Sequence, residues 1–445
     1  MRLGTSYGQI FRLSLPIMLG SAAQNIIVLS DNVFLYHYDH LQFAAVGVIG
    51  AFYLVLASIG YGFSRGGQIF IARKYGEKDM KSLGMYFQAL VLFEAVLAVL
   101  IFGFIHLFGY DFLKLLISST EILDYCYEYL YYRSYGVFFS YLGVALIALY
   151  TGIAQPKIIL FDTLVLTISN IILNYVFVFG KWGAPAMGIG GSALASTLSE
   201  VIAFIVFIAY IVYKRAYKTY HLLDFTSINL RRIYECFSIS FPIVIQSALG
   251  LGSYFLFFTF IENNSAKDLE ISNLIRNIYL ILSIPAWGYS AGINTMVSNF
   301  IGTKKRQAVF PLIQKTAWLS FLTTSAITLP ILLFPEFFLY PLFGSSENQL
   351  VSESKTILWI LFPILGIFSF GSIFINGLTG TGHTKTALWI QTLFTIVYTI
   401  YSLMVIKFLK LNLYFAWSAE IIYWLGIMIF VIIYLKTNKW HEKKF

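Results

Sequence analysis

The sequence predicts an all-α membrane protein with twelve transmembrane helices in two six-helix bundles, related by a pseudo-twofold axis along the membrane normal. Three observations lead to this fold class. Of the 445 residues, 58% are hydrophobic and only 11% are charged, whereas soluble domains average about 25% charged residues. Apolar runs long enough to cross a hydrocarbon core recur along the whole chain. Short sequence strings of the first half also return in order in the second half.

Each predicted helix is an apolar run that can cross a hydrocarbon core about 30 Å thick. The twelve runs cover residues 12–36, 42–72, 84–108, 122–150, 158–180, 188–213, 236–261, 271–300, 309–334, 356–378, 386–409 and 413–435. The first run has a polar, proline-containing interior and no small-residue cleavage site, so we expect a retained helix rather than a signal peptide.

Basic residues predict the orientation of these helices. If the N-terminus is inside, twenty Lys and Arg residues fall on inner segments and only six on outer ones, namely Lys114, Lys181, Lys267, Lys355, Lys407 and Lys410. The positive-inside rule then places both termini in the cytoplasm of a multi-pass protein of the cell (inner) membrane. This bias accounts for most of the net charge of +9, so the lipid bilayer is the expected partner and nucleic acid is not.

An internal repeat divides the chain into halves. The string FRLSLPI at Phe11 recurs as FSISFPI at Phe237, a spacing of 226 residues. The strings around Gly76 (ARKYGEKD) and Gly302 (SNFIGTKK) keep that spacing, and TGIAQPK matches TGTGHTK after a shift of two. Three matches in the same order indicate a duplication. Because each half has an even number of helices, both halves should have the same orientation in the membrane.

The duplication defines the expected domains. Residues 1–213 form an N-terminal six-helix lobe, 214–235 a cytoplasmic linker, and 236–445 a C-terminal six-helix lobe. Pro16 and Pro242 occupy matching places inside the first helix of each lobe. Proline removes a backbone hydrogen bond and bends a helix, so this pair is a candidate for matched hinges.

Asp31 is the only carboxylate in the first long apolar run. A carboxylate at membrane depth costs on the order of 3 kcal/mol, so we expect Asp31 to line a wet cavity or to bind a cation. The alternative is a side chain that reaches water near the outer end of its helix. Aspartate is short for that purpose compared with lysine or arginine.

Five features in order resemble the multidrug and toxic compound extrusion (MATE) family over essentially the whole chain. They are the repeated Phe/Ser/Pro opening, the spacing of Asp31 from Pro16, the loop around Gly76, the segment NIILNYVFVFGKWGAPAMGIGGSALAST from Asn170, and GLTGTGHTK from Gly377. The resemblance implies a secondary active antiporter that exports organic cations or other amphipathic drugs in exchange for H⁺ or Na⁺. It implies no cofactor other than this coupling ion, no enzymatic activity, and function as a monomer.

The resemblance also assigns residues to a cation-coupling site. Asp31 matches the family's first-helix aspartate, Asn170 and Asn174 match its fifth-helix pair, and Ser196 matches its sixth-helix hydroxyl residue, with Thr197 as the neighbouring candidate. One carboxylate, two amides and a hydroxyl suit a protonatable aspartate or a Na⁺ ion held by Asp31, Asn170 and Asn174. The alternative role for the two asparagines is hydrogen bonding between helices, which is common in membrane bundles.

The C-terminal lobe departs from part of the family. The sodium-coupled bacterial branch carries acidic residues at two places that fall here near Gly250 and Phe368, and neither is acidic. The chain therefore resembles the branch that lacks acidic residues in the C-terminal lobe and relies on the N-terminal aspartate alone. Protons gain weight as the coupling ion, and sodium is not excluded.

Other intramembrane residues are candidates for a relay or for the substrate cleft. Glu94 lies in the middle of the third run with no basic residue within a turn. Glu200 and Glu420 are expected to pair across helices with Arg65, Arg276 or Lys315. Aromatic and methionine side chains bind flat apolar cations, and the candidates for this contact are Tyr36, Tyr53, Met187, Met296 and Phe368.

One rival function class remains open on the sequence. The chain has no GxxxxGK[ST] loop and no HExxH string, which disfavours ATP-driven transport and metalloprotease chemistry. The serious alternative is a lipid-linked oligosaccharide flippase of the related two-lobe superfamily. Such a cleft should be rich in basic residues, and here only Arg65 and Arg276 are candidates for it.

Overall fold

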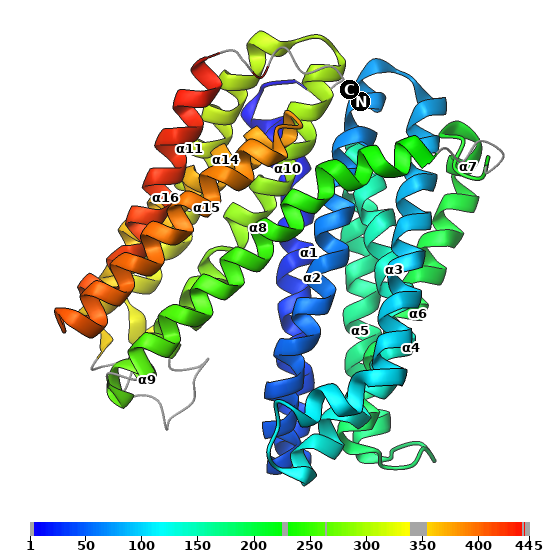
Figure 1. The fold of residues 1–445 in the computed structure, drawn as a ribbon. Helices are drawn as coiled ribbons and strands as arrows, with labels where there is room; N and C mark the ends of the chain where they lie inside the picture. The colour runs from blue at the N-terminus through cyan, green and yellow to red at the C-terminus, as the bar shows by residue number, and fades with distance from the viewer. Residues whose placement is uncertain (1–3, 225–229, 263–264, 339–353, 438–439, 441–445) are drawn as a thin grey trace. The chain divides into compact units, whose positions relative to one another are not determined.

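The structure is a computed structural model that describes residues 4–224, 230–262, 265–338, 354–437 and 440. All regular secondary structure in these ranges is helical (Figure 1). The chain divides into two compact units, residues 19–244 and residues 1–18 together with 245–445. Each cut falls within the first helix of a sequence half, two residues after Pro16 in α1 (Tyr7–Tyr38) and two residues after Pro242 in α8 (Leu230–Glu262). Both helices continue through their proline.

The unit of residues 19–244 is a helical bundle organised around α4. Its further helices are α2 (His40–Glu77), α3 (Met80–Lys114), α4 (Thr120–Gly152), α5 (Lys157–Phe179), α6 (Gly188–Tyr213) and the short α7 (Ala216–Thr219). Helix α4 packs against α2, α3 and α6, and α5 packs along α6. These long helices run side by side in Figure 1, so α5 and α6 can bring polar side chains to the same interior.

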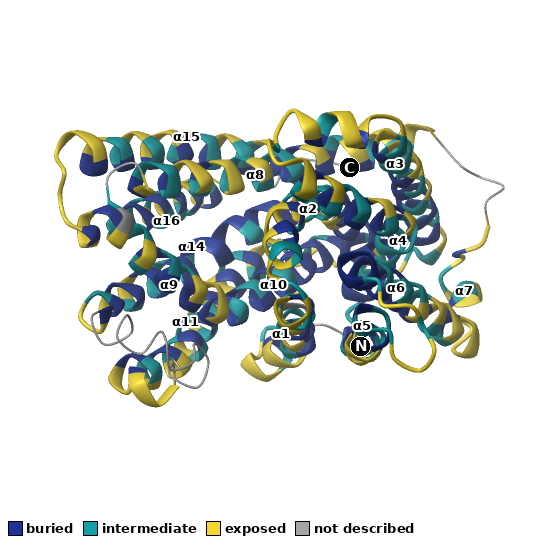
Figure 2. Cartoon of the chain, turned by 90° about the horizontal axis from the view of Figure 1, so that it is seen from below, coloured by how far each residue is buried: buried dark blue, intermediate teal, exposed yellow. Residues whose placement is uncertain are grey.

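The second unit repeats this pattern around α14. Its helices are α9 (Ala266–Leu282), α10 (Ile284–Gly302), α11 (Val309–Leu333), α14 (Leu361–Gly380), α15 (Thr384–Leu403) and α16 (Leu413–Lys436), with short helical segments at Arg306–Ala308, Ile357–Ile360 and Met404–Phe408. Helix α14 packs against α10, α11 and α16, and α15 packs along α16. Figure 2 shows α10 and α14 mostly buried, whereas α11 and α15 present exposed faces. The two units thus share one helix-packing scheme, as the duplication predicts.

The predicted run 271–300 is not one continuous helix. The described residues contain 11 helices long and apolar enough to cross a membrane, and this run is the one that the structure breaks, at Ser283 between α9 and α10. Pro285 follows the break, and proline cannot donate the hydrogen bond that would continue the helix. If α9 and α10 together are counted as one interrupted transmembrane span, the number of spans is the predicted twelve.

Side-chain caps set several helix starts. Asp39 accepts hydrogen bonds from the backbone N–H of Leu41 and Gln42, both at 2.9 Å, at the start of α2. Asp79 accepts one from Ser82 N at 3.0 Å at the start of α3. These bonds satisfy backbone donors that have no partner within the helix. The same role belongs to Ser119 before α4, Ser265 before α9 and Asn412 before α16.

The predicted linker 214–235 is helical at its end and docked at its beginning. Residues 225–229 lie outside the described part, and α8 already begins at Leu230. Gln88 of α3 donates through Nε2 to the carbonyl of His221 at 2.8 Å. Gly84 of α3 lies directly against the carbonyls of Tyr220 and His221. The first part of the linker is therefore held on α3.

Small-residue contacts repeat at the spacing of the duplication. In the unit of residues 19–244, a Cβ at Gly66 of α2 would lie 2.7 Å from Cα of Ser240, and Ser240 Oγ donates to the carbonyl of Phe63 at 2.9 Å. In the other unit, a Cβ at Gly292 of α10 would lie 2.5 Å from Oγ of Ser14. Both Gly66 and Gly292, and Ser14 and Ser240, are 226 residues apart. Ser14 of α1 and Ser240 of α8 therefore make equivalent close contacts with a glycine of another helix.

Candidate functional site

Four predicted site residues meet in the unit of residues 19–244. Asp31 of α1 accepts hydrogen bonds through Oδ1 from Nδ2 of Asn174 at 2.6 Å and from Nδ2 of Asn170 at 3.3 Å. Its other oxygen, Oδ2, accepts from Oγ of Ser196 at 3.2 Å. Three helices, α1, α5 and α6, thus converge on one carboxylate, and we call these four residues the Asp31 cluster.

The geometry of the cluster follows from helix periodicity. Asn170 and Asn174 are four residues apart on α5 and so face the same side. Asn170 Nδ2 also donates to Ser196 Oγ at 3.0 Å, and Asn174 Nδ2 donates to Asn170 Oδ1 at 3.1 Å. Asp31 is 9% exposed and Asn174 is 0% exposed. The carboxylate is therefore held in place and largely shielded from solvent.

The Asp31 cluster contains no ion pair, and the positive charge that acts on Asp31 is that of Arg133. In the described part of the chain, none of the ion pairs involves Asp31, and its partners are all neutral. Asn174 Oδ1 is buried without a hydrogen-bond partner. A carboxylate with a free amide oxygen beside it offers the oxygen ligands that Na⁺ prefers, and the carboxylate alone can take a proton. Among the described residues there is no group of three His, Cys, Asp or Glu side chains that could hold a metal ion.

A buried ion pair lies in the same unit. Arg133 of α4 donates through Nη2 to Oε1 of Glu200 on α6 at 2.9 Å. The Arg133 guanidinium also lies 4.1 Å from the ring centroid of Tyr53 on α2. The expectation that Glu200 pairs across helices is confirmed, but its partner is Arg133 rather than Arg65, Arg276 or Lys315. Sequence reasoning missed Arg133, whose signal was a charged residue inside the predicted helix 122–150.

Thr197 lies outside the Asp31 cluster. Its Oγ1 donates to the backbone carbonyl of Tyr132 on α4 at 3.0 Å, whereas Ser196 faces α1 and α5. Successive residues on a helix point about 100° apart, so two neighbouring hydroxyls cannot serve the same site equally. The structure therefore selects Ser196 from the two candidates.

Glu94 is anchored on α3, away from the contacts of the Asp31 cluster. It is 0% exposed, Ser64 Oγ of α2 donates to its Oε1 at 2.8 Å, and its Oε2 has no hydrogen-bond partner. A neutral hydroxyl is thus its hydrogen-bond partner.

The aromatic and methionine candidates are distributed over both units. Tyr53 lies beside Arg133, whereas Tyr36 is 51% exposed and contacts the rings of His37, His40 and Phe43. Met187 precedes α6, and its backbone N–H donates to Phe177 O at 2.9 Å. Met296 and Phe368 are buried in the other unit.

The second unit has a buried carboxylate on its last helix. Glu420 of α16 is buried, and Trp424 Nε1 donates to its Oε2 at 3.0 Å. The ring of Trp424 lies 4.8 Å from that of Phe368. The expected pairing of Glu420 with arginine or lysine is not seen among the ion pairs of the described residues.

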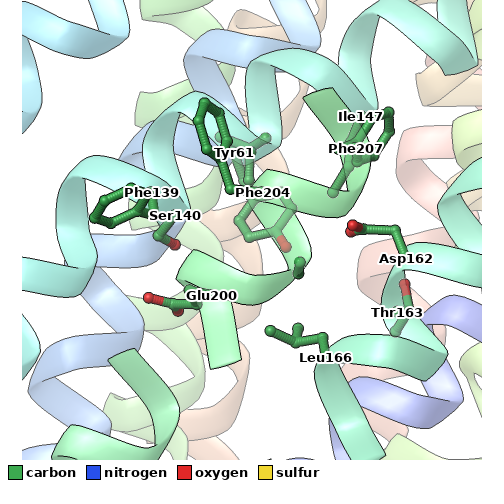
Figure 3. Close-up of a pocket in the computed structure, with 13 residues that line it drawn as sticks. Tyr61, Phe139, Ser140, Ile147, Asp162, Thr163, Leu166, Glu200, Phe204 and Phe207 are labelled. Carbon is green, nitrogen blue, oxygen red and sulfur yellow. The ribbon is translucent and has the colours of Figure 1, made fainter. Parts of the chain in front are cut away.

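A carboxylate that sequence reasoning missed lines a cavity in the unit of residues 19–244. Asp162 of α5 is buried and its side chain points into this cavity (Figure 3). The available signal was an aspartate inside an apolar run, KIILFDTLVL, the same signal that singled out Asp31.

A family model called MatE matches residues 16–176 and 242–405. The two matched segments begin at Pro16 and Pro242, the residues aligned by the internal repeat. The match therefore covers both halves of the duplication.

Curated relatives match over nearly the whole chain. A probable multidrug resistance protein NorM of Thermotoga maritima is 25% identical over 449 residues, which cover 98% of this chain and 93% of that protein. The multidrug export protein MepA of Staphylococcus haemolyticus is 26% identical over 387 residues, which cover 85% of this chain and 82% of that protein.

Solved structures share the fold. A multidrug resistance MATE family transporter of the MOP superfamily, in an outward-facing conformation, matches with a TM-score of 0.85 at 17% identity and covers 98% of this chain and 96% of its own. A MOP superfamily transporter from Pyrococcus furiosus matches with a TM-score of 0.84 at 19% identity, and the match covers 97% of this chain and 95% of that transporter. The predicted all-α fold of twelve spans in two bundles is confirmed by this likeness.

Proposed function

Because this chain belongs to the MATE family of multidrug efflux transporters, we propose that it is an antiporter that exports organic cations or other amphipathic drugs in exchange for H⁺ or Na⁺. Family membership makes it an integral multi-pass membrane transporter rather than an enzyme, and does not favour the flippase alternative. The observation that carries the coupling proposal is the Asp31 cluster, a buried carboxylate whose hydrogen-bond partners are all neutral.

The proposed coupling step occurs at Asp31. An ionised carboxylate in a shielded site is stabilised by a bound cation or neutralised by a proton. Uptake of either weakens the hydrogen bonds that Asn174 and Ser196 donate to the charged carboxylate, because charge-assisted bonds are the stronger ones. That loosening frees α1 to bend at Pro16 and expel the drug. Alternation of the two states of α1 then couples the ion to the export.

The free energy of the coupling ion is sufficient to export a drug against a concentration gradient. One elementary charge moving through about 100 mV supplies roughly 2.3 kcal/mol. This corresponds to nearly a fifty-fold gradient of a neutral solute at one-to-one stoichiometry, since each 1.4 kcal/mol is a factor of ten.

The proposed setting is the cell (inner) membrane, with both termini in the cytoplasm. The support is the excess of Lys and Arg on inner segments. We propose that the chain functions as a monomer, because both lobes are present in it. We also propose that the lipid bilayer is its partner besides the transported drug and the coupling ion.

The test is ethidium movement in proteoliposomes under an imposed proton gradient and, separately, an imposed sodium gradient. Wild type should move ethidium under one of the two, and Asp31→Asn should abolish the movement. Asp111→Asn, which changes an exposed carboxylate of α3, is the matched control and should behave as wild type. Lack of transport under both gradients would contradict the antiport proposal, and activity surviving in Asp31→Asn would move the coupling site elsewhere.

A further inference from the structure

The strongest unexplained feature is the cavity that contains Asp162. It has a volume of about 100 Å³ and lies within the unit of residues 19–244, between side chains of α2, α4, α5 and α6. Figure 3 shows Asp162 pointing into it from α5, with Glu200 on the opposite side and Phe204 between them. The remaining polar lining is Tyr61 of α2, Ser140 of α4 and Thr163 of α5.

Asp162 has a free carboxylate oxygen in this cavity. The residue is 8% exposed, and its Oδ1 is buried without a hydrogen-bond partner. A buried carboxylate needs a hydrogen-bond donor, a cation or a proton. No lysine, arginine or histidine is among the lining residues.

The neighbouring groups favour a cation. The ionisable groups that line the cavity with Asp162 are Tyr61 of α2 and Glu200 of α6, and α4 contributes none. Glu200 uses Oε1 for Arg133 at 2.9 Å, whereas its Oε2 is buried without a partner. The charge of Glu200 is thus balanced by Arg133, whereas Asp162 brings a carboxylate to the cavity with an unused oxygen and no basic side chain among the lining residues.

A polar stripe on α5 runs from this cavity to the Asp31 cluster. Thr163, which lines the cavity, and Thr167, Asn170 and Asn174 are buried on one face of α5, and Asp162 is buried on the adjacent face. Thr163 Oγ1 donates to the Ile159 carbonyl and Thr167 Oγ1 to the Thr163 carbonyl, both at 2.8 Å. Their hydrogens are thereby used, and their oxygens keep lone pairs for a passing cation. Asp162 and Asn170 are about 12 Å apart along the helix axis at 1.5 Å per residue.

We infer that Asp162 is a second binding station for a small monovalent cation, H⁺ or Na⁺, between the Asp31 cluster and the Lys157 end of α5. This inference rests on the proposed function and deepens it, because it gives the coupling ion a way out after Asp31 releases it. In the proposed orientation the Lys157 end of α5 is cytoplasmic, so the ion would pass from Asp31 to Asp162 and then to the cell interior. The cation is not altered in transit, and each carboxylate returns to its starting charge.

The first experiment counts cations bound to the purified full chain. We would measure equilibrium binding of ²²Na⁺ at fixed pH and, separately, proton uptake on acidification, for wild type, Asp31→Asn, Asp162→Asn and the double variant. Asp31→Asn should keep one cation that the double variant loses, and Asp162→Asn should lose one relative to wild type. If the number of bound ²²Na⁺ ions follows this pattern, the cation is Na⁺. If only the number of protons taken up follows it, the cation is H⁺. Equal counts in Asp31→Asn and the double variant would overturn the inference.

The second experiment separates a cation station from a structural role. In proteoliposomes, Asp162→Asn should lower gradient-driven ethidium transport about ten-fold, as is typical when a partner of a cation site is removed, and Asp162→Glu should recover most of it. Ethidium affinity of the purified protein should stay within about two-fold of wild type, since the drug is not the ligand of this station. Normal transport in Asp162→Asn, or loss of ethidium affinity in both variants, would refute the assignment.

The two proposals can fail separately. A wild type that moves no ethidium under either gradient contradicts antiport, yet the cation count still decides the role of Asp162. If Asp162→Asn does not fold, Asp162→Ser in the Asp31→Asn background gives the same decision: loss of the remaining cation supports the station, and its retention overturns it.

Discussion

Asn174 makes the shortest hydrogen bond to Asp31, at 2.6 Å. It belongs to α5, so this bond connects the carboxylate of α1 to a different helix. Its Oδ1 is also the buried atom without a partner. The same side chain can therefore orient the carboxylate through its nitrogen and offer a ligand to a cation through its oxygen.

We expect Asn174→Ala to shift the ion dependence of transport in a direction that identifies the ion. Losing a hydrogen bond to a charged group costs about 1.5–3 kcal/mol, and a proton on Asp31 relieves that cost, so the proton concentration for half-maximal ethidium transport should fall roughly ten- to hundred-fold. The corresponding Na⁺ concentration should rise, because Na⁺ loses the Oδ1 ligand of Asn174. The measurement is the transport rate in proteoliposomes across a series of sodium concentrations and, separately, of pH values. Thr197→Ala removes a bond to Tyr132 outside the cluster and should leave both concentrations unchanged. An unchanged value in Asn174→Ala would mean that Asn174 is only a packing residue.

At the scale of elements, two glycines, Gly66 and Gly292, determine how closely neighbouring helices approach. Helix α8 lies against α2 where Ser240 meets Gly66, and α1 lies against α10 where Ser14 meets Gly292. A side chain at either glycine would meet backbone or Oγ atoms of a serine. In both repeats, the helices can therefore pack this closely only because a glycine lies at the contact.

Gly66→Ala and Gly292→Ala should each destabilise the protein. Overpacking of a filled interface typically costs about 1–3 kcal/mol, and this should appear as a lower melting temperature in detergent. Gly47→Ala is the control, because Gly47 lies on the same helix as Gly66 and has nothing within 4 Å of the added Cβ. Alanine at an open helical site should be neutral or stabilising. Equal melting temperatures for all three variants would show that the helix contacts at Gly66 and Gly292 are not tightly packed.

At the scale of the whole molecule, the basic residues predict which side of the membrane each loop faces. Lys181 lies between α5 and α6, and Lys304 follows α10. Both are exposed. The positive-inside rule places Lys181 outside and Lys304 inside.

Cysteine labelling tests this orientation. In a background that lacks Cys126 and Cys236, which are free and buried, Lys181→Cys should react with a membrane-impermeant maleimide in intact cells. Lys304→Cys should react only after permeabilisation. The reverse pattern would place the termini outside and would also reverse the direction proposed for the ion past Asp162.

Much of the architecture could be predicted because it depends on composition and spacing. Apolar runs determine the number of spans, and the 226-residue repeat anticipated the shared packing of α2–α4 and α10–α14. The break at Ser283 was missed because the length of an apolar run does not show where Pro285 interrupts its hydrogen bonds.

The sequence by itself determined that this protein is a helical, duplicated membrane protein with a carboxylate, Asp31, inside its first apolar run, because hydropathy, charge and repeat spacing are properties of the chain alone. Only the tertiary structure decided which side chains meet: Ser196 rather than Thr197 at Asp31, Arg133 at Glu200, and Asp162 in a cavity. These choices depend on how each helix is rotated about its axis, where one residue changes the direction by about 100°. That rotation is fixed by packing between helices that are distant in sequence.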